Sequence, residues 1–188
     1  KRRSNKPLAV MVRSLADAER LCHVDDAERD LLAGSIRPIV LLRRRGAGEG
    51  DFSDALELAP SVAHDLPELG VMLPYTPLQH LLLAAAETHG MHALVMTSGN
   101  LSEEPIETDD DLAWKHLVAA GVADALLGND RAILSRYDDS VVRVVDGAVM
   151  PVRRARGYAP QPLPLPALAS AAPCVLACGP QQKATIAL

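Results

Sequence analysis

The sequence predicts an α/β fold in which helices flank a twisted, mixed β-sheet. Two observations lead to this prediction. Short apolar runs alternate with capped helical stretches over the first two thirds of the chain, and a β-hairpin pattern follows them. The 188 residues are 48% hydrophobic and 23% charged, which is an ordinary globular composition. A chain of this length buries roughly 70% of its unfolded surface, so the core needs no disulfide or metal.

The first quarter of the chain predicts two strands and two helices. Residues 7–12 and 37–42 are short apolar runs with β-branched side chains, which is typical of strands. Between them, a serine caps a predicted helix over residues 14–22, and a glycine ends a second helix over residues 25–34. Glycines and charges over residues 43–51 then predict a mobile loop.

The clearest helix lies within residues 71–90. Thr76 is a good N-cap, Pro77 fits the first helical position, and Gly90 ends the helix. Four apolar side chains form a stripe that we expect to face the sheet, namely Leu78, Leu81, Leu82 and Ala85.

The second half continues the alternation and then changes to a hairpin. Residues 93–96 predict a strand. Thr108 and the aspartates after it predict the start of another helix, because acidic side chains in the first turn interact favourably with the helix dipole. Residues 123–128 predict a short strand. Two β-rich runs around Asp146-Gly147 then predict a hairpin.

The C-terminal part predicts a boundary between domains. Residues 160–173 are rich in proline and alanine, which is typical of an extended linker. Residues 174–188 begin with a new apolar run. We therefore expect one domain over residues 1–159, a linker, and the first strand of a following domain, in a chain that is a piece of a longer protein.

Composition also limits the function classes. The net charge of −5 argues against broad binding of nucleic acid, and aromatic residues at 3% argue against a stacking surface for single strands. Three cysteines, Cys22, Cys174 and Cys178, are too few for a disulfide framework and predict free thiols in the cytoplasm. No metal-ligand spacing and no apolar run long enough to span a membrane occur in the sequence.

Four polar stretches are candidates for binding a ligand, and each has a plain structural alternative. Thr97–Asn100 follow a predicted strand, where open α/β sheets bind ligands, but these residue types also form turns. Residues 1–6 contain four cations that suit a polyphosphate or a solvated terminus. Arg153–Arg156 suit phosphate or a protected edge strand, and Asp138-Asp139 suit Mg²⁺, an arginine or a polar turn.

Taken together, these stretches resemble one family. The shared segments, in chain order, are residues 1–11, 69–83, 95–106, 133–143 and 153–160. Over residues 1 to about 160 the sequence resembles the YrdC-like domain of the HypF carbamoyltransferases of hydrogenase maturation, and residues 174–188 resemble the start of their actin-like ATPase domain. The resemblance implies a YrdC-like sheet that lacks the family's first Gly-rich strand and loop. It departs from the family pattern at Ser4, where proline is usual, and over residues 179–184.

The resemblance also implies the chemistry and the residues that perform it. Members use ATP, with Mg²⁺, and carbamoyl phosphate or carbamate to make carbamoyl-adenylate, and the carbamoyl group then passes to a cysteine of a HypE-type partner protein. The family's K-x-R and S-x-N patterns fall on Lys1, Arg3, Ser98 and Asn100. Further phosphate contacts are expected from Lys6, Arg143, Arg154 and Arg156. No nucleophilic catalytic residue is predicted, because adenylation depends on positioning and on neutralising phosphate charge.

Two other functions remain open at this point. Threonylcarbamoyl-adenylate synthases, which serve tRNA modification, share the same two patterns. A non-catalytic module that binds double-stranded RNA through a basic surface is the second alternative, and the acidic net charge disfavours it. Neither RNA nor a membrane is an expected partner.

Overall fold

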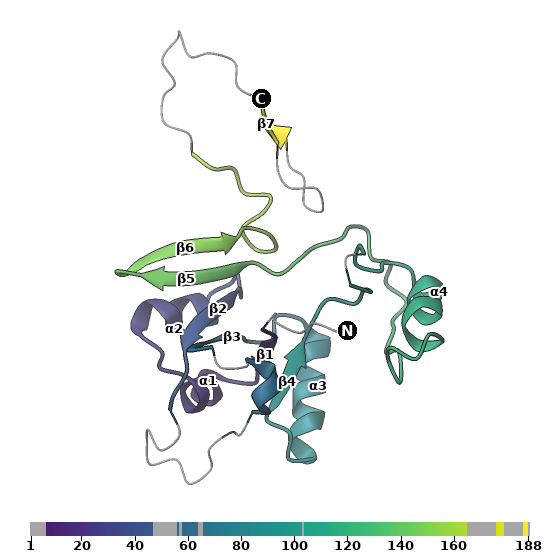
Figure 1. The fold of residues 1–188 in the computed structure, drawn as a ribbon, viewed down its shortest axis with the longest axis horizontal. Coiled ribbons are helices and arrows are strands. Elements are labelled where there is room, and N and C mark those ends of the chain that lie inside the picture. The colour runs from purple at the N-terminus through teal and green to yellow at the C-terminus, as the bar shows by residue number, and fades with distance from the viewer. Residues whose placement is uncertain are drawn as a thin grey trace. The chain divides into compact units, whose positions relative to one another are not determined.

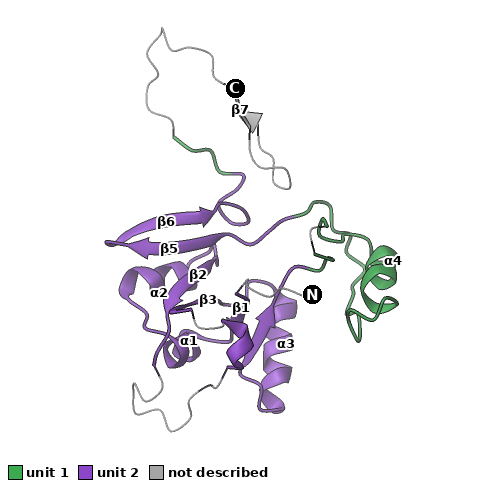
Figure 2. Ribbon diagram, viewed as in Figure 1, with its two compact units in different colours: residues 1–2, 99–136, 161–188 green, residues 3–98, 137–160 purple. Residues whose placement is uncertain are grey.

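The fold was obtained as a computed structural model that describes residues 7–46, 56, 58–63, 66–102, 104–164, 176–178 and 186–187. The chain divides into two compact units (Figure 2). The sheet unit comprises residues 3–98 and 137–160, and the second unit comprises residues 1–2, 99–136 and 161–188.

A six-stranded mixed sheet forms the centre of the sheet unit (Figure 1). Its strands are β1 (Ala9–Val12), β2 (Ile39–Arg43), β3 (Glu68–Met72), β4 (Ala93–Met96), β5 (Val141–Val145) and β6 (Ala148–Arg153). They lie in the order β4-β1-β3-β2-β5-β6. The pairs β1–β3 and β2–β5 are parallel and the other pairs are antiparallel, which confirms the predicted mixed sheet.

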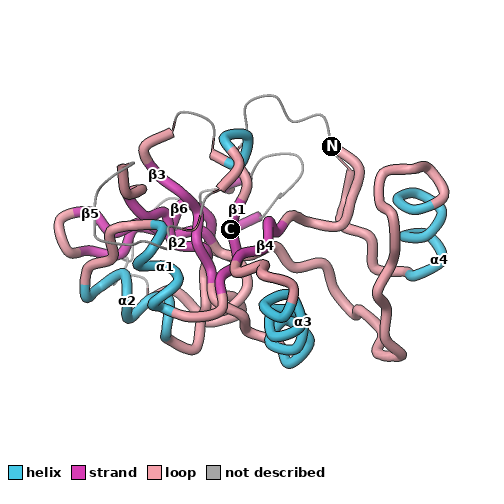
Figure 3. The backbone as a smooth tube through the Cα atoms, turned by 90° about the horizontal axis from the view of Figure 1, so that it is seen from below, coloured by secondary structure: helices cyan, strands magenta, loops and turns pink. Residues whose placement is uncertain are grey.

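Helices cover both faces of this sheet. The helices α1 (Leu15–Leu21) and α2 (Asp26–Ala33) begin at capping boxes and pack on the face that carries the larger core. Because side chains alternate along a strand, Val10 and Val12 enter this core while Met11 points to the opposite face. There Met11 meets α3 (Pro77–Thr88), which lies near β4 and apart from the adjacent α1 and α2 (Figure 3).

The ends of α3 agree with the prediction, but its buried face does not. Thr76 Oγ1 accepts from the Gln79 amide at 3.3 Å, and Gly90 has a φ of 73° that favours glycine. The predicted stripe is wrong, since all four of its residues are exposed: Leu78, Leu81, Leu82 and Ala85. Leu83 and Ala86 are buried instead. The helix is apolar on nearly all sides from residue 81 to 86, so contact with the sheet selects the buried face, and periodicity does not.

One strand was missed and one predicted strand is absent. β3 lies between β1 and β2, with Leu69 and Val71 in the larger core and Met72 on the opposite face. A short strand buried on both faces shows no alternation of apolar and polar residues. Its apolar run therefore cannot be distinguished by pattern from the apolar residues of the helix that follows. Residues 123–128 are described without helix or strand and are mostly exposed, so the strand predicted there is wrong.

The predicted hairpin is confirmed. β5 and β6 are antiparallel, and Asp146 and Gly147 join them with φ values of 50° and 75°. Positive φ at both central residues is the geometry for which an Asp-Gly pair is favoured.

The second unit contains α4 (Asp110–Ala113), which Asp109 caps, and a π-helical turn, η2 (Trp114–Val118). Residues 177–178 (β7) lie within the predicted C-terminal strand and pair with residues 186–187 (β8). The predicted linker falls largely outside the described residues, as does the end of the predicted loop at 43–51. Within the part of the chain that the structure describes, no helix is long and apolar enough to cross a membrane.

Candidate functional site

The predicted serine lies where β4 leaves the sheet. Ala9 pairs with Met96 in antiparallel register, so the chain leaves β4 beside the point where it enters β1. Ser98 is half-buried just beyond the last residue of β4. We call this end of the strands the Ser98 end of the sheet. Pro7, the first described residue, leads into β1 at the same end. The predicted cations Lys1, Arg3 and Lys6 lie outside the described residues.

Arg143 lies toward the same end of the sheet. Val142 is in register with Val40, and Arg143 is one residue nearer the Ser98 end. Its Nη2 atom lies 2.5 Å from Glu68 Oε2, and both side chains are a little over one third exposed. The Arg143 Nε atom is buried without a hydrogen-bond partner. The arginine is therefore held by one carboxylate and keeps a donor that the described residues do not satisfy.

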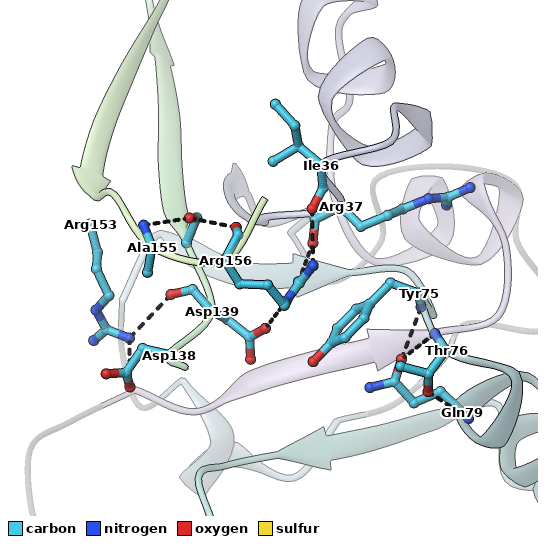
Figure 4. Close-up of polar contacts among 11 residues, drawn as sticks. Ile36, Arg37, Tyr75, Thr76, Gln79, Asp138, Asp139, Arg153, Ala155 and Arg156 are labelled. Atoms are coloured by element: carbon cyan, nitrogen blue, oxygen red, sulfur yellow. Dashed lines mark hydrogen bonds and ion pairs between the residues drawn. The ribbon is translucent and has the colours of Figure 1, made fainter. Parts of the chain in front are cut away.

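Arg156 lies beyond the opposite end of the sheet, because β6 ends at Arg153, in register with Val141. Its three guanidinium nitrogens all donate within the protein (Figure 4). Nε donates to Asp139 Oδ1 at 2.9 Å, and the two terminal nitrogens donate to the carbonyls of residues 36 and 37 at 3.1 and 2.7 Å. The guanidinium carbon also lies 3.4 Å from the centre of the Tyr75 ring.

Backbone contacts hold this segment against the sheet unit. The Ser140 side chain is fully buried, donates to the Arg156 carbonyl and accepts from the Ala155 amide, both at 2.8 Å. Gly157 has a φ of 90°, and a Cβ atom there would lie 2.7 Å from Ile36 Cγ2. Only glycine fits such a position. We call Ile36, Arg37, Tyr75, Asp139, Ser140, Arg156 and Gly157 the Arg156 cluster.

Burial and charge also affect the tyrosine of this cluster. Burial raises the pKa of Tyr75, and the Asp139 carboxylate beside it acts in the same direction. The phenol therefore stays neutral near pH 7 and presents an uncharged ring face to Arg156.

The paired aspartates hold arginines. Asp139 accepts from Arg156, and Asp138 Oδ1 lies 3.6 Å from Arg153 Nη1. Of the alternatives that the sequence left open, the structure supports the arginine role. Arg154 is exposed and donates to the Tyr158 carbonyl at 2.9 Å. Among the described residues, no three His, Cys, Asp or Glu side chains gather as a metal site.

In the second unit, the asparagine of the S-x-N pattern closes its own loop. Asn100 is only 7% exposed, and its Nδ2 atom donates to the Glu104 carbonyl at 2.6 Å. The Glu107 amide donates to the Gly99 carbonyl at 2.9 Å, so the two ends of the segment meet. We call the described residues 99–102 and 104–107 the S-x-N loop. This structural use of the Asn100 amide was not predicted.

Two further contacts in the second unit were missed by sequence reasoning. Glu107 Oε1 lies 2.7 Å from His116 Nδ1, and Arg136 Nε donates to the Ile106 carbonyl at 2.7 Å. Neither pair has a recognisable sequence spacing, since nine and thirty residues separate the partners. Only the fold brings them together.

Comparison with known proteins then identifies the family. Residues 1–155 match the family model described as "Telomere recombination" (Sua5_yciO_yrdC). The chain belongs to this family. Among its relatives, it is 46% identical over 202 residues to carbamoyltransferase HypF2 of Cupriavidus necator, in an alignment that covers 100% of this chain and 23% of that protein.

Solved structures agree with this assignment. Full-length HypF in its phosphate- and nucleotide-bound form is 44% identical, with a TM-score of 0.73 over 85% of this chain and 23% of that one. HypF of T. kodakarensis is 34% identical, with a TM-score of 0.75 over 87% of this chain and 20% of that one. The chain is thus a YrdC-like domain that matches the corresponding portion of the HypF carbamoyltransferases, as its resemblance predicted, and it spans about a quarter of their length.

Proposed function

We propose that this domain binds ATP and forms carbamoyl-adenylate as one step of a carbamoyltransferase. The observation that carries the proposal is the 46% identity to a carbamoyltransferase across the whole of this chain. Full-length HypF, which is 44% identical to this chain, has been crystallised in a phosphate- and nucleotide-bound form, and this supports ATP as the substrate class.

The reaction is an adenylyl transfer. Carbamate, released from carbamoyl phosphate by hydrolysis, attacks the α-phosphorus of ATP through a carboxylate oxygen. A new O–P bond forms, the bond from the α-phosphorus to the bridging oxygen breaks, and pyrophosphate leaves with that electron pair. The protein need only align the two anions and neutralise their charge, which cations and small hydroxyl or amide donors do well.

We assign the phosphate contacts to Lys1, Arg3, Lys6, Ser98 and Asn100. The topology supports this choice, because the chain enters β1 beside the end of β4, and residues 1–6 directly precede Pro7 in the sequence. The Asn100 Nδ2 atom donates to the Glu104 carbonyl and orders the S-x-N loop, and its second N–H is the donor that we assign to phosphate.

The remaining arginines divide between two roles. Arg143 lies toward the Ser98 end with its side chain a little over one third exposed, so we assign its Nη2 atom a phosphate contact in exchange for Glu68. Arg154 is exposed and stays a predicted phosphate contact. Arg156 uses its donors inside the protein, and we assign it a structural role in place of the phosphate contact expected from the sequence.

The other reactants follow from the same assignment. Mg²⁺ arrives with ATP, and the carbamoyl group passes to a cysteine of a HypE-type maturation protein through the remaining domains of the enzyme. The relatives that support this step are about four times longer than the present chain.

Exchange of labelled pyrophosphate into ATP tests the proposal in the full-length protein. Exchange should depend on carbamoyl phosphate, and Lys1→Ala, Arg3→Ala or Asn100→Ala should lower it by about 10–100-fold, because a charge-assisted contact contributes roughly 1.5–3 kcal/mol. Arg29→Ala, which removes a surface ion pair with Glu19, is the matched control and should keep the wild-type rate. Wild-type exchange in the three site variants would refute the site. Exchange that requires threonine and bicarbonate would instead show a threonylcarbamoyl-adenylate synthase.

A further inference from the structure

The S-x-N loop is held in one shape by contacts at both of its ends. The Gly99 carbonyl accepts from the Glu107 amide, and the Asn100 side chain donates to the Glu104 carbonyl. Glu104 also donates its amide to the Leu101 carbonyl at 3.2 Å. These bonds are internal to the loop, and a separate contact connects the loop to the helix after it.

Glu107 supplies that contact. Its backbone closes the loop, while its side chain, only 13% exposed, reaches His116 with a separation of 2.7 Å. A carboxylate only accepts hydrogen bonds, so His116 Nδ1 carries the proton and donates it. One residue therefore joins the loop closure to the helix that follows.

His116 lies within the π-helical turn η2. In η2 the Ala119 amide donates to the Trp114 carbonyl at 2.8 Å, one residue beyond α-helical spacing. The extra residue in the turn rotates the side chains after Trp114 relative to those of α4, and π-turns of this kind are frequent at functional sites. Arg136 adds a second anchor by donating to the Ile106 carbonyl, next to Glu107.

We propose that Glu107 and His116 are positioning residues that keep the S-x-N loop in its nucleotide-binding shape before ATP arrives. This inference rests on the proposed function, since it takes the loop as part of the nucleotide site. Neither residue needs to touch the substrate. A loop that is ordered in advance loses less conformational entropy on binding, so the pair should raise affinity for ATP and leave the chemical step unchanged.

Two measurements on the full-length protein test this inference. The first is hydrogen exchange of residues 99–107 without nucleotide, and the second is the separate measurement of KM for ATP and of kcat in pyrophosphate exchange. The variants are Glu107→Ala, His116→Ala, their double variant and the conservative Glu107→Gln, which keeps the acceptor oxygen. His80→Ala, on the exposed side of α3, is the matched control.

Each alanine variant should speed hydrogen exchange of the loop and raise KM about 3–10-fold, the fold-change of one side-chain hydrogen bond, with kcat within about twofold. The double variant should match the single ones, because both remove the same contact. Glu107→Gln and His80→Ala should stay within about twofold of wild type.

Unchanged hydrogen exchange in the alanine variants would overturn the inference, as would additive effects in the double variant or a fall in kcat at constant KM. Failure of the proposed function looks different. In that case hydrogen exchange of the loop still responds to the Glu107 and His116 variants, but Asn100→Ala keeps the wild-type KM for ATP. The contact between Glu107 and His116 then exists, and the loop does not bind ATP.

Discussion

Replacing Arg156 by alanine separates a structural from a ligand-binding role for this arginine. Its side chain is 23% exposed and makes three hydrogen bonds, one of them with the Asp139 carboxylate. Removing one partner of a fully buried ion pair costs about 3–5 kcal/mol, and the loss here lies at the lower end of this range because Asp139 is 31% exposed to water. The lost contact with the Tyr75 ring adds roughly 0.5–2 kcal/mol. Because contributions from one side chain are not additive, we expect a total loss of about 4 kcal/mol.

Thermal unfolding followed by far-UV circular dichroism measures this loss. For a domain of this size 1 kcal/mol lowers Tm by about 2–4 °C, so Arg156→Ala should unfold about 8–16 °C below wild type. Arg154→Ala is the matched control. It removes an exposed arginine whose guanidinium donates to the Tyr158 carbonyl, and its free energy of unfolding should change by less than about 1 kcal/mol.

An Arg156→Ala protein that unfolds at the wild-type temperature but no longer binds ATP would make Arg156 a ligand residue and refute the structural role.

Three further predictions follow from burial and backbone geometry. Leu83→Ala should lower the free energy of unfolding by about 2–5 kcal/mol because Leu83 is 1% exposed, whereas Leu81→Ala should change it by less than about 0.5 kcal/mol; equal effects in urea unfolding would contradict the buried face of α3. Burial raises the pKa of the Cys22 thiol from near 9 to about 12. The unfolded chain therefore loses this proton first, and stability should fall as pH rises from 9 to 12, by up to about 1.4 kcal/mol per pH unit relative to Cys22→Ala; parallel pH profiles would contradict it. Gly157→Ala should cost about 2 kcal/mol or more because its Cβ would meet Ile36, and a wild-type Tm would show that the segment is not packed as described.

Local signals account for the part of the fold that could be predicted. The Asp146-Gly147 hairpin and the Thr76-Pro77 helix start depend on backbone geometry that few residue types adopt. Both features can therefore be predicted from the residue types alone. The α/β class followed from the alternation of such signals.

Tertiary contacts determine the part that could not be predicted. β3 carries Gly70 in the middle of an apolar run and is recognised only when β1 and β2 pair with it on either side. The buried face of α3 also depends on tertiary contacts, because Leu83 packs with Met11 and Met72 of the sheet.

The candidate site shows the same division. The sequence predicted Thr97–Asn100 as candidates from their place after a strand, and the resemblance selected Ser98 and Asn100 among them. Three sets of contacts depend on folding, and no sequence pattern predicts them. They are the bond from Asn100 to Glu104, the internal contacts of Arg156, and the contact between Glu107 and His116.

A crystal structure of the full-length protein with a non-hydrolysable ATP analogue tests the central claim most directly. The claim requires nucleotide phosphate oxygens within about 3.2 Å of Ser98 Oγ and of the Arg3 guanidinium. Phosphates bound at the Arg156 cluster, at the opposite end of the sheet, with Ser98 and Arg3 free of contact, would contradict it.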